Sequence, residues 1–102
     1  MSRKDQIEEL LQDDPENSFL RYGLAMEYVS VGDDAQAVFA FQEVIRRDAD
    51  YVPAYLQAGR ALIRMGRDDE AKEVLRQGIS VAQKVGDAHA AGEMSGFLQS
   101  LG

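Results

Sequence analysis

Apolar residues recur every three or four positions along most of the chain, which is the spacing of one face of an α-helix. The segment 17–31 shows this pattern clearly. Its predicted inward-facing residues are Leu20, Leu24, Tyr28 and Val31. No segment alternates between apolar and polar residues with the period of two that marks a half-buried strand. The pattern therefore predicts an all-α fold without strands.

Glycine, proline and aspartate residues indicate where these helices end and begin. Gly32 can take the left-handed conformation that ends a helix, and Asp33 can cap the next one. Gly86 and Asp87 repeat this signal, and Pro53 suits the first turn of a helix. These signals predict one helical domain over residues 1–102 with about six helices: an N-terminal helix at about 2–13, a first hairpin at about 18–51, a second hairpin at about 52–85 and a last helix at about 87–101.

The same periodicity assigns an inward face to each of the other helices. In the N-terminal helix, Ser2 and Asp5 have the spacing of a capping box. The predicted inward residues of all these helices are Ile7, Leu10 and Leu11, then Ala37, Phe41, Val44 and Ile45, then Tyr55, Ala58, Gly59, Leu62 and Met65, then Ala71, Val74, Leu75, Gly78, Ile79 and Ala82, and finally Ala91, Met94, Leu98 and Leu101. Phe39 points away from Phe41, so with Val38 it could make an edge contact in a dimer, or it could lie under the N-terminal helix.

Sliding the sequence by 34 residues superimposes the first hairpin on the second. The identical pairs are Gly32 with Gly66, Asp34 with Asp68, Ala37 with Ala71, and Ile45 with Ile79. Each hairpin of such a repeat leaves an apolar face that a neighbour must cover. The two units are therefore expected to stack, with the terminal helices capping the stack.

The placement of small and large residues within this period resembles the tetratricopeptide repeat (TPR). The first helix of that pattern appears here as Leu24-Ala25-Met26-Glu27-Tyr28, followed by the turn glycine Gly32, the small residue Ala37 and the large residue Phe41. The chain departs from the pattern in two ways. Arg21 replaces an early aromatic residue in the first unit, and the closing proline is missing from both units, with Ala49 in its place in the first. The resemblance implies antiparallel hairpins stacked as a short right-handed α-α superhelix of two units with flanking helices.

The resemblance also implies a concave groove lined by the first helix of each unit. The groove positions are Phe19, Tyr22, Met26 and Val29 in the first unit, and Leu56, Arg60, Ile63 and Arg64 in the second. Arg60 and Arg64 are one helical turn apart and could hold a carboxylate together, or each could pair with local acids. A terminal helix that folds over the groove would bury the same residues. The implied function is a non-enzymatic module that binds a protein or peptide segment, with self-association into a homo-oligomer as the alternative.

The charge and the missing residue types exclude several other functions. A net charge of −7 argues against binding to nucleic acid or to an anionic membrane surface. The chain has no cysteine, and no apolar run approaches the ~18 residues that span a bilayer. The single histidine, His89, offers neither a metal site nor a triad, and the acids at the helix starts are explained by capping. We therefore expect a cytoplasmic interaction protein without a cofactor.

Overall fold

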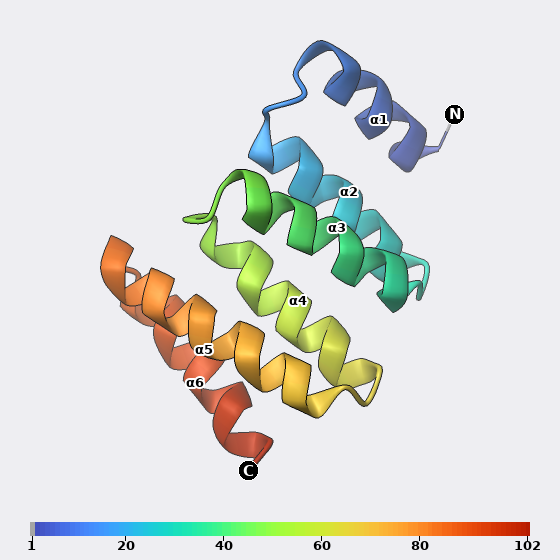
Figure 1. The fold of residues 1–102 in the computed structure, drawn as a ribbon. Helices are drawn as coiled ribbons and strands as arrows, with labels where there is room; N and C mark the ends of the chain where they lie inside the picture. The colour runs from blue at the N-terminus through green and yellow to red at the C-terminus, as the bar shows by residue number, and fades with distance from the viewer. Residues whose placement is uncertain (1) are drawn as a thin grey trace.

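The computed structural model describes residues 2–102, and this part of the chain is entirely helical (Figure 1). Its helices are α1 (Arg3–Asp13), α2 (Ser18–Ser30), α3 (Asp34–Arg47), α4 (Val52–Arg64), α5 (Asp68–Val85) and α6 (Ala88–Ser100). No strand occurs within residues 2–102, so the all-α prediction is confirmed.

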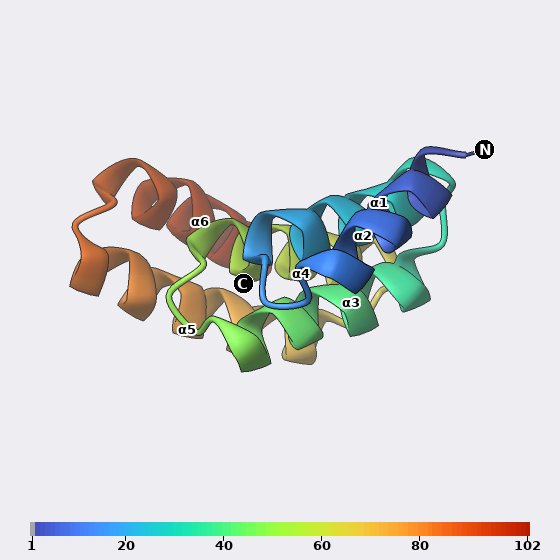
Figure 2. The ribbon, with the colours of Figure 1, turned by 90° about the horizontal axis from the view of Figure 1, so that it is seen from above.

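Each helix packs mainly against its neighbours in the sequence, which gives an elongated array with the two termini at opposite ends (Figure 1). Seen from above, α3 and α5 form one layer, and α2, α4 and α6 form the other (Figure 2). We call the outer surface of the second layer the α2–α4–α6 face. The array measures 42 × 29 × 19 Å, so no side chain lies far from solvent and the core is thin.

The helix ends follow the signals in the sequence. Ser2 and Asp5 form the predicted capping box on α1, and the Asp33 carboxylate accepts a hydrogen bond from the backbone N–H of Gln36 at the start of α3. Gly32 has a φ of +79°, a conformation that costs a residue with a Cβ more than glycine. The N–H of Asp33 then reaches back to the carbonyl of Tyr28, which closes α2 with a Schellman-type turn.

The core consists of three adjoining clusters between the two layers. In the first, Phe41 and Val44 of α3 pack between Ala25 of α2 and the Ala54 and Ala58 residues of α4. The second joins α4, α5 and α6 around Leu75 and Met94, and the third joins α3, α4 and α5 around Val38 and Leu62. Small residues on α2 and α4 allow the helices to approach closely enough to bury these larger side chains.

The prediction that Val31 faces inward is wrong. Its side chain is 76% exposed, because Val31 is the C-cap of α2 and the chain leaves the helical path there. The face that packs against the first cluster instead includes Tyr22, Met26 and Val29, which are half-buried. The core stripe and the predicted groove stripe of α2 therefore overlap.

Helix α1 is the least buried element. None of its residues is buried, and Leu10 of its predicted apolar stripe is 54% exposed. Within residues 2–102, α2 is the main neighbour of α1, whereas α3 and α5 are each packed between two helices. Phe39 is not covered by α1 and is 72% exposed, while Val38 beside it is buried.

Arg21 and Tyr55 occupy equivalent repeat positions and make the same hydrogen bond. The Tyr55 hydroxyl donates to the carbonyl of Ala49 at 2.7 Å, and Nε of Arg21 donates to the carbonyl of Pro15 at 2.8 Å. Pro15 and Ala49 are themselves 34 residues apart. Each bond ties the loop before a hairpin to the first helix of that hairpin. Arg21 therefore preserves this contact with the preceding loop although it is not aromatic.

Replacing Tyr55 with phenylalanine is expected to lower the free energy of unfolding by about 1 kcal/mol, because the carbonyl of Ala49 loses its partly buried donor while the ring stays in place. Chemical denaturation of the variant would measure this. Tyr28→Phe is the control, since the Tyr28 hydroxyl makes no hydrogen bond within residues 2–102. Equal costs for the two variants would contradict a role for the Tyr55 bond.

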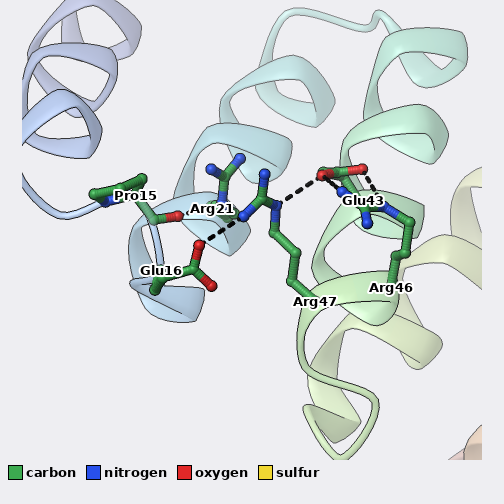
Figure 3. A network of polar contacts seen from close by, with 6 residues as sticks. All are labelled: Pro15, Glu16, Arg21, Glu43, Arg46 and Arg47. Carbon is green, nitrogen blue, oxygen red and sulfur yellow. Dashed lines mark hydrogen bonds and ion pairs between the residues drawn. The ribbon is translucent and has the colours of Figure 1, made fainter.

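An ion-pair network connects the loop between α1 and α2 to the end of α3 (Figure 3). Arg47 lies between Glu16 and Glu43, at 2.9 Å and 2.7 Å from their carboxylate oxygens. Hydrogen bonds from Arg46 and Arg47 lower the pKa of the Glu43 carboxyl to about 2, so this group stays ionised near neutral pH. The network helps to fix the loop, and with it the direction in which α1 leaves the array.

Candidate functional site

The half of the predicted groove on the second hairpin is a shallow pocket between α4 and α6. Its volume is about 220 Å³, and it is lined by Arg60, Ile63, Arg64 and Phe97. The Arg60 guanidinium carbon lies 5.7 Å from the centre of the Phe97 ring, a cation–π distance. Arg60 is exposed and has no carboxylate partner within residues 2–102. It can therefore meet an acidic group of a ligand.

Arg64 already forms an ion pair within the protein. Its guanidinium donates from two nitrogens to the Asp34 carboxylate at the start of α3, at 2.9 Å and 3.1 Å. Arg64 therefore pairs with an acid rather than holding a shared carboxylate with Arg60, but the acid is 30 residues away on α3 and not a local one as the sequence suggested. Arg60 and Arg64 thus lie in one pocket but have different partners, and Arg60 alone is available.

Leu56 and Ile63 are half-buried rather than free. Both pack against the cluster of α4, α5 and α6, where Phe97 is also a member. Helix α6 therefore covers part of the predicted groove on the second hairpin. Leu56 and Ile63 therefore lie at the base of this surface and are only partly accessible to a ligand.

The half of the groove on the first hairpin opens between α1 and α2. It has a volume of about 520 Å³ and includes three of the predicted residues, Phe19, Tyr22 and Met26. Phe19 is 72% exposed, so α1 does not cover it. Val29, the fourth predicted residue, does not line this groove and packs against the first core cluster.

Tyr22 joins the groove between α1 and α2 to the first core cluster and to the start of α4. Its ring lies 5.7 Å from that of Phe41 and 5.4 Å from that of Tyr51, both in tilted geometry. Burial, followed by the neighbouring Tyr51, raises the pKa of the Tyr22 hydroxyl, which therefore stays protonated and can donate a hydrogen bond.

Helix α1 contributes a part of this groove that the sequence pattern did not predict. Arg3, Gln6, Ile7 and Leu10 line it together with Leu20, Gly23, Glu27 and Ser30 of α2. Arg3 forms an ion pair with Glu27 at 2.8 Å across one end. The signal available in the sequence was the Ile7–Leu10 stripe, which was interpreted only as core.

The residue types needed for other chemistry are not gathered in the described part of the chain. His89 is exposed, with Glu93 3.9 Å away, and no cluster of three metal-ligating side chains occurs within residues 2–102. No helix in that range is long and apolar enough to cross a membrane. What the geometry does offer is two pockets lined in part by half-buried apolar side chains, with exposed Phe19 in one and Arg60 in the other.

Comparison with known proteins identifies the fold family. A sequence model described as the tetratricopeptide repeat matches residues 28–92. The chain belongs to the tetratricopeptide repeat family. A TPR repeat-containing protein of Pseudomonas aeruginosa is 30% identical over 95 residues, which cover 93% of this chain and 90% of the relative.

Two solved structures superimpose well on this chain. A tetratricopeptide repeat domain protein from Salinibacter ruber has a TM-score of 0.80 at 32% identity, covering 85% of this chain and 88% of its own. A protein from Bordetella parapertussis has a TM-score of 0.86, covering 99% of this chain and 88% of its own. Its identity is 24%, so that likeness concerns the fold.

The family gives a general role to the surface. TPR folds generally mediate protein–protein interactions and are typically non-enzymatic modules. In this TPR protein, the first helices of the two units, α2 and α4, carry the exposed Phe19 and Arg60 on the surface described above.

Proposed function

We propose that this chain is a non-enzymatic interaction module that binds a polypeptide segment along the α2–α4–α6 face. The observation that carries the proposal is the pair of open pockets on this face, one containing exposed Phe19 and the other containing unpaired Arg60. An apolar side chain of the segment would contact Phe19 and Met26. An acidic side chain or a terminal carboxylate would meet the Arg60 guanidinium.

Tyr22 belongs to the binding surface but is a poor place for a test. Because its ring packs on Phe41 and Tyr51, truncating it would disturb the core together with the surface. Arg60 is the better choice, since its side chain is exposed, lies over the Phe97 ring and has no ion-pair partner within residues 2–102.

Arg60→Glu is expected to weaken partner binding about tenfold or more, because a favourable charge becomes a repulsive one at the contact. Proteins captured on the immobilised wild type and variants would be identified by mass spectrometry, and their affinities measured by calorimetry. Arg76→Glu makes the same charge change at an exposed position of α5 with no ion pair within residues 2–102.

Identical partners and affinities for Arg60→Glu and Arg76→Glu would contradict the assignment of this face. Self-association through the same face is the competing function. Light scattering over a concentration series separates the two, because self-association predicts a mass that rises with concentration and falls back in Arg60→Glu.

A further inference from the structure

The groove between α1 and α2 lies where the repeat geometry places another helix. Its lining residues on α1 are 34 positions before Ala37, Ala40, Phe41 and Val44 of α3. These four α3 side chains pack into the first core cluster, together with Ala25 of α2. The corresponding residues of α1 line an open groove instead, and α1 is the last helix at its end of the array (Figure 1). The groove is thus the counterpart of the position that α2 fills beside α3.

We propose that this groove binds an amphipathic α-helix of a partner protein, with apolar residues facing the groove and basic residues along its flank. The proposal rests on the interaction role proposed above, but it depends on α1 residues that the α2–α4–α6 face does not need. A helix fits this site because the equivalent place beside α3 is filled by a helix of 13 residues.

The floor of the groove supplies the apolar contact. Ile7 and Leu10 from α1 meet Phe19 and Leu20 from α2, and Leu10 and Phe19 are 54% and 72% exposed. Gly23 adds no side chain between the two helices, and a Cβ there would lie 3.6 Å from Ile7 Cδ1. An incoming apolar side chain can therefore reach the junction of α1 and α2. Exposed apolar patches of this kind usually mark contact surfaces.

Acidic side chains beside the groove, at its rim, supply the negative charge that would attract a basic helix. Glu9 follows the groove residue Gln6 by three positions, and Asp13 follows Leu10 by three, so both acids border the groove along α1. Both are exposed, and neither has an ion-pair partner within residues 2–102. Residues 3–17 contain six acidic and two basic residues. Lysine or arginine side chains on the flank of the incoming helix would complement this rim.

The same charge argues against a second copy of this chain as the occupant. Helix α6 is the terminal helix that could stack on α1 of another copy, yet it contains Glu93 and no lysine or arginine. It therefore offers no lysine or arginine to complement the acidic rim of α1. A basic amphipathic helix of another protein is therefore the better match.

The test uses the full-length protein and a fluorescein-labelled synthetic peptide of 13 residues, the length of α2. The peptide is held helical by a lactam bridge and carries leucines at positions i, i+3, i+4 and i+7 with lysines on both flanks. Fluorescence anisotropy gives its affinity. A scrambled peptide of the same composition, and a version with the lysines replaced by glutamate, should each bind at least tenfold more weakly.

Matched variants locate the binding site. Leu10→Ser should weaken binding about fivefold, while Val85→Ser, a similarly exposed change at the far end of α5, should leave it unchanged. Phe19→Ser should weaken binding about tenfold, and Phe39→Ser is its control because both rings are 72% exposed. Equal effects within either pair would overturn the proposal.

Charge variants test whether the acidic residues beside the groove contribute to binding. Neutralising the rim in Glu9→Gln/Asp13→Asn should weaken peptide binding several-fold more than Asp69→Asn/Glu73→Gln, which removes the same charge from α5. Arg60→Glu tests the proposed function separately, because Arg60 lines the pocket between α4 and α6 and not this groove. If the peptide fails to bind while natural partners still depend on Arg60, only the helix proposal fails. A mass doubling in solution that Phe19→Ser abolishes would assign the groove to a second copy instead.

Discussion

Replacing Phe41 with alanine is expected to lower the free energy of unfolding by about 3–5 kcal/mol. The Phe41 ring is fully buried between the two layers, where it meets small residues of α2 and α4 and the tilted ring of Tyr22. Alanine would leave a cavity that joins both units. The cost falls on the cluster that, within residues 2–102, joins α2 to both α3 and α4, so the first hairpin should separate from the second.

Denaturant unfolding followed by circular dichroism measures the effect of Phe41→Ala. Phe39→Ala removes the same ring two residues earlier in α3, where the side chain is 72% exposed, and should change stability by no more than about 0.5 kcal/mol. Small domains have roughly 5–15 kcal/mol of stability in total, so Phe41→Ala should also be partly unfolded near body temperature. Equal stabilities of the two alanine variants would contradict this account of the core.

Helix ends and the repeat were predictable from the sequence because their causes are local. A glycine with positive φ followed by an aspartate cap requires only neighbouring residues, and Gly32 with Asp33 behaves as expected. The 34-residue period likewise shows itself in residue size, and it placed Phe41 and Leu75 in the core, where both are fully buried.

The sequence did not predict how much of each helix face is covered by a neighbouring helix. Periodicity shows which residues share a face, but it does not show how far a neighbouring helix reaches along that face. This is why Val31 was placed inward although the helix ends there, and why Leu10 was assigned to the core although α1 has a free side. The error at Val31 arises at the end of a helix, and the error at Leu10 arises at the end of the helical array, where α1 lacks a second neighbour.

The candidate site was partly predictable for a related reason. The spacing of Arg60 and Arg64 put both on one side of α4, and both do line one pocket. Their partners come from other elements, Asp34 from α3 and Phe97 from α6, at sequence separations that no local pattern encodes. The presence of Arg21 in place of an aromatic residue is likewise explained by the structure. Its hydrogen bond to the carbonyl of Pro15 is equivalent to the bond from Tyr55 to the carbonyl of Ala49.

Gly78→Val is expected to cost about 3 kcal/mol, because α5 has no room for a side chain at this position. A Cβ on Gly78 would lie 2.5 Å from the Met94 sulfur and 2.6 Å from Cβ of Tyr55. Met94 is flexible and can move aside, but Cβ of Tyr55 is fixed to the backbone of α4. The helix must therefore shift away from α4 or α6, which opens the cluster around Leu75.

Gly92→Val separates this packing effect from the general effect of replacing a glycine in a helix. Gly92 lies within α6, and a Cβ there would meet nothing within 4 Å. Because valine has a higher helix propensity than glycine, this variant should be neutral or more stable by a few tenths of a kcal/mol. Thermal unfolding of both variants by calorimetry gives the comparison. If Gly78→Val is as stable as Gly92→Val, the close contact of α5 with α4 and α6 does not hold in solution, and the place of α6 beside Arg60 on the binding face loses its support.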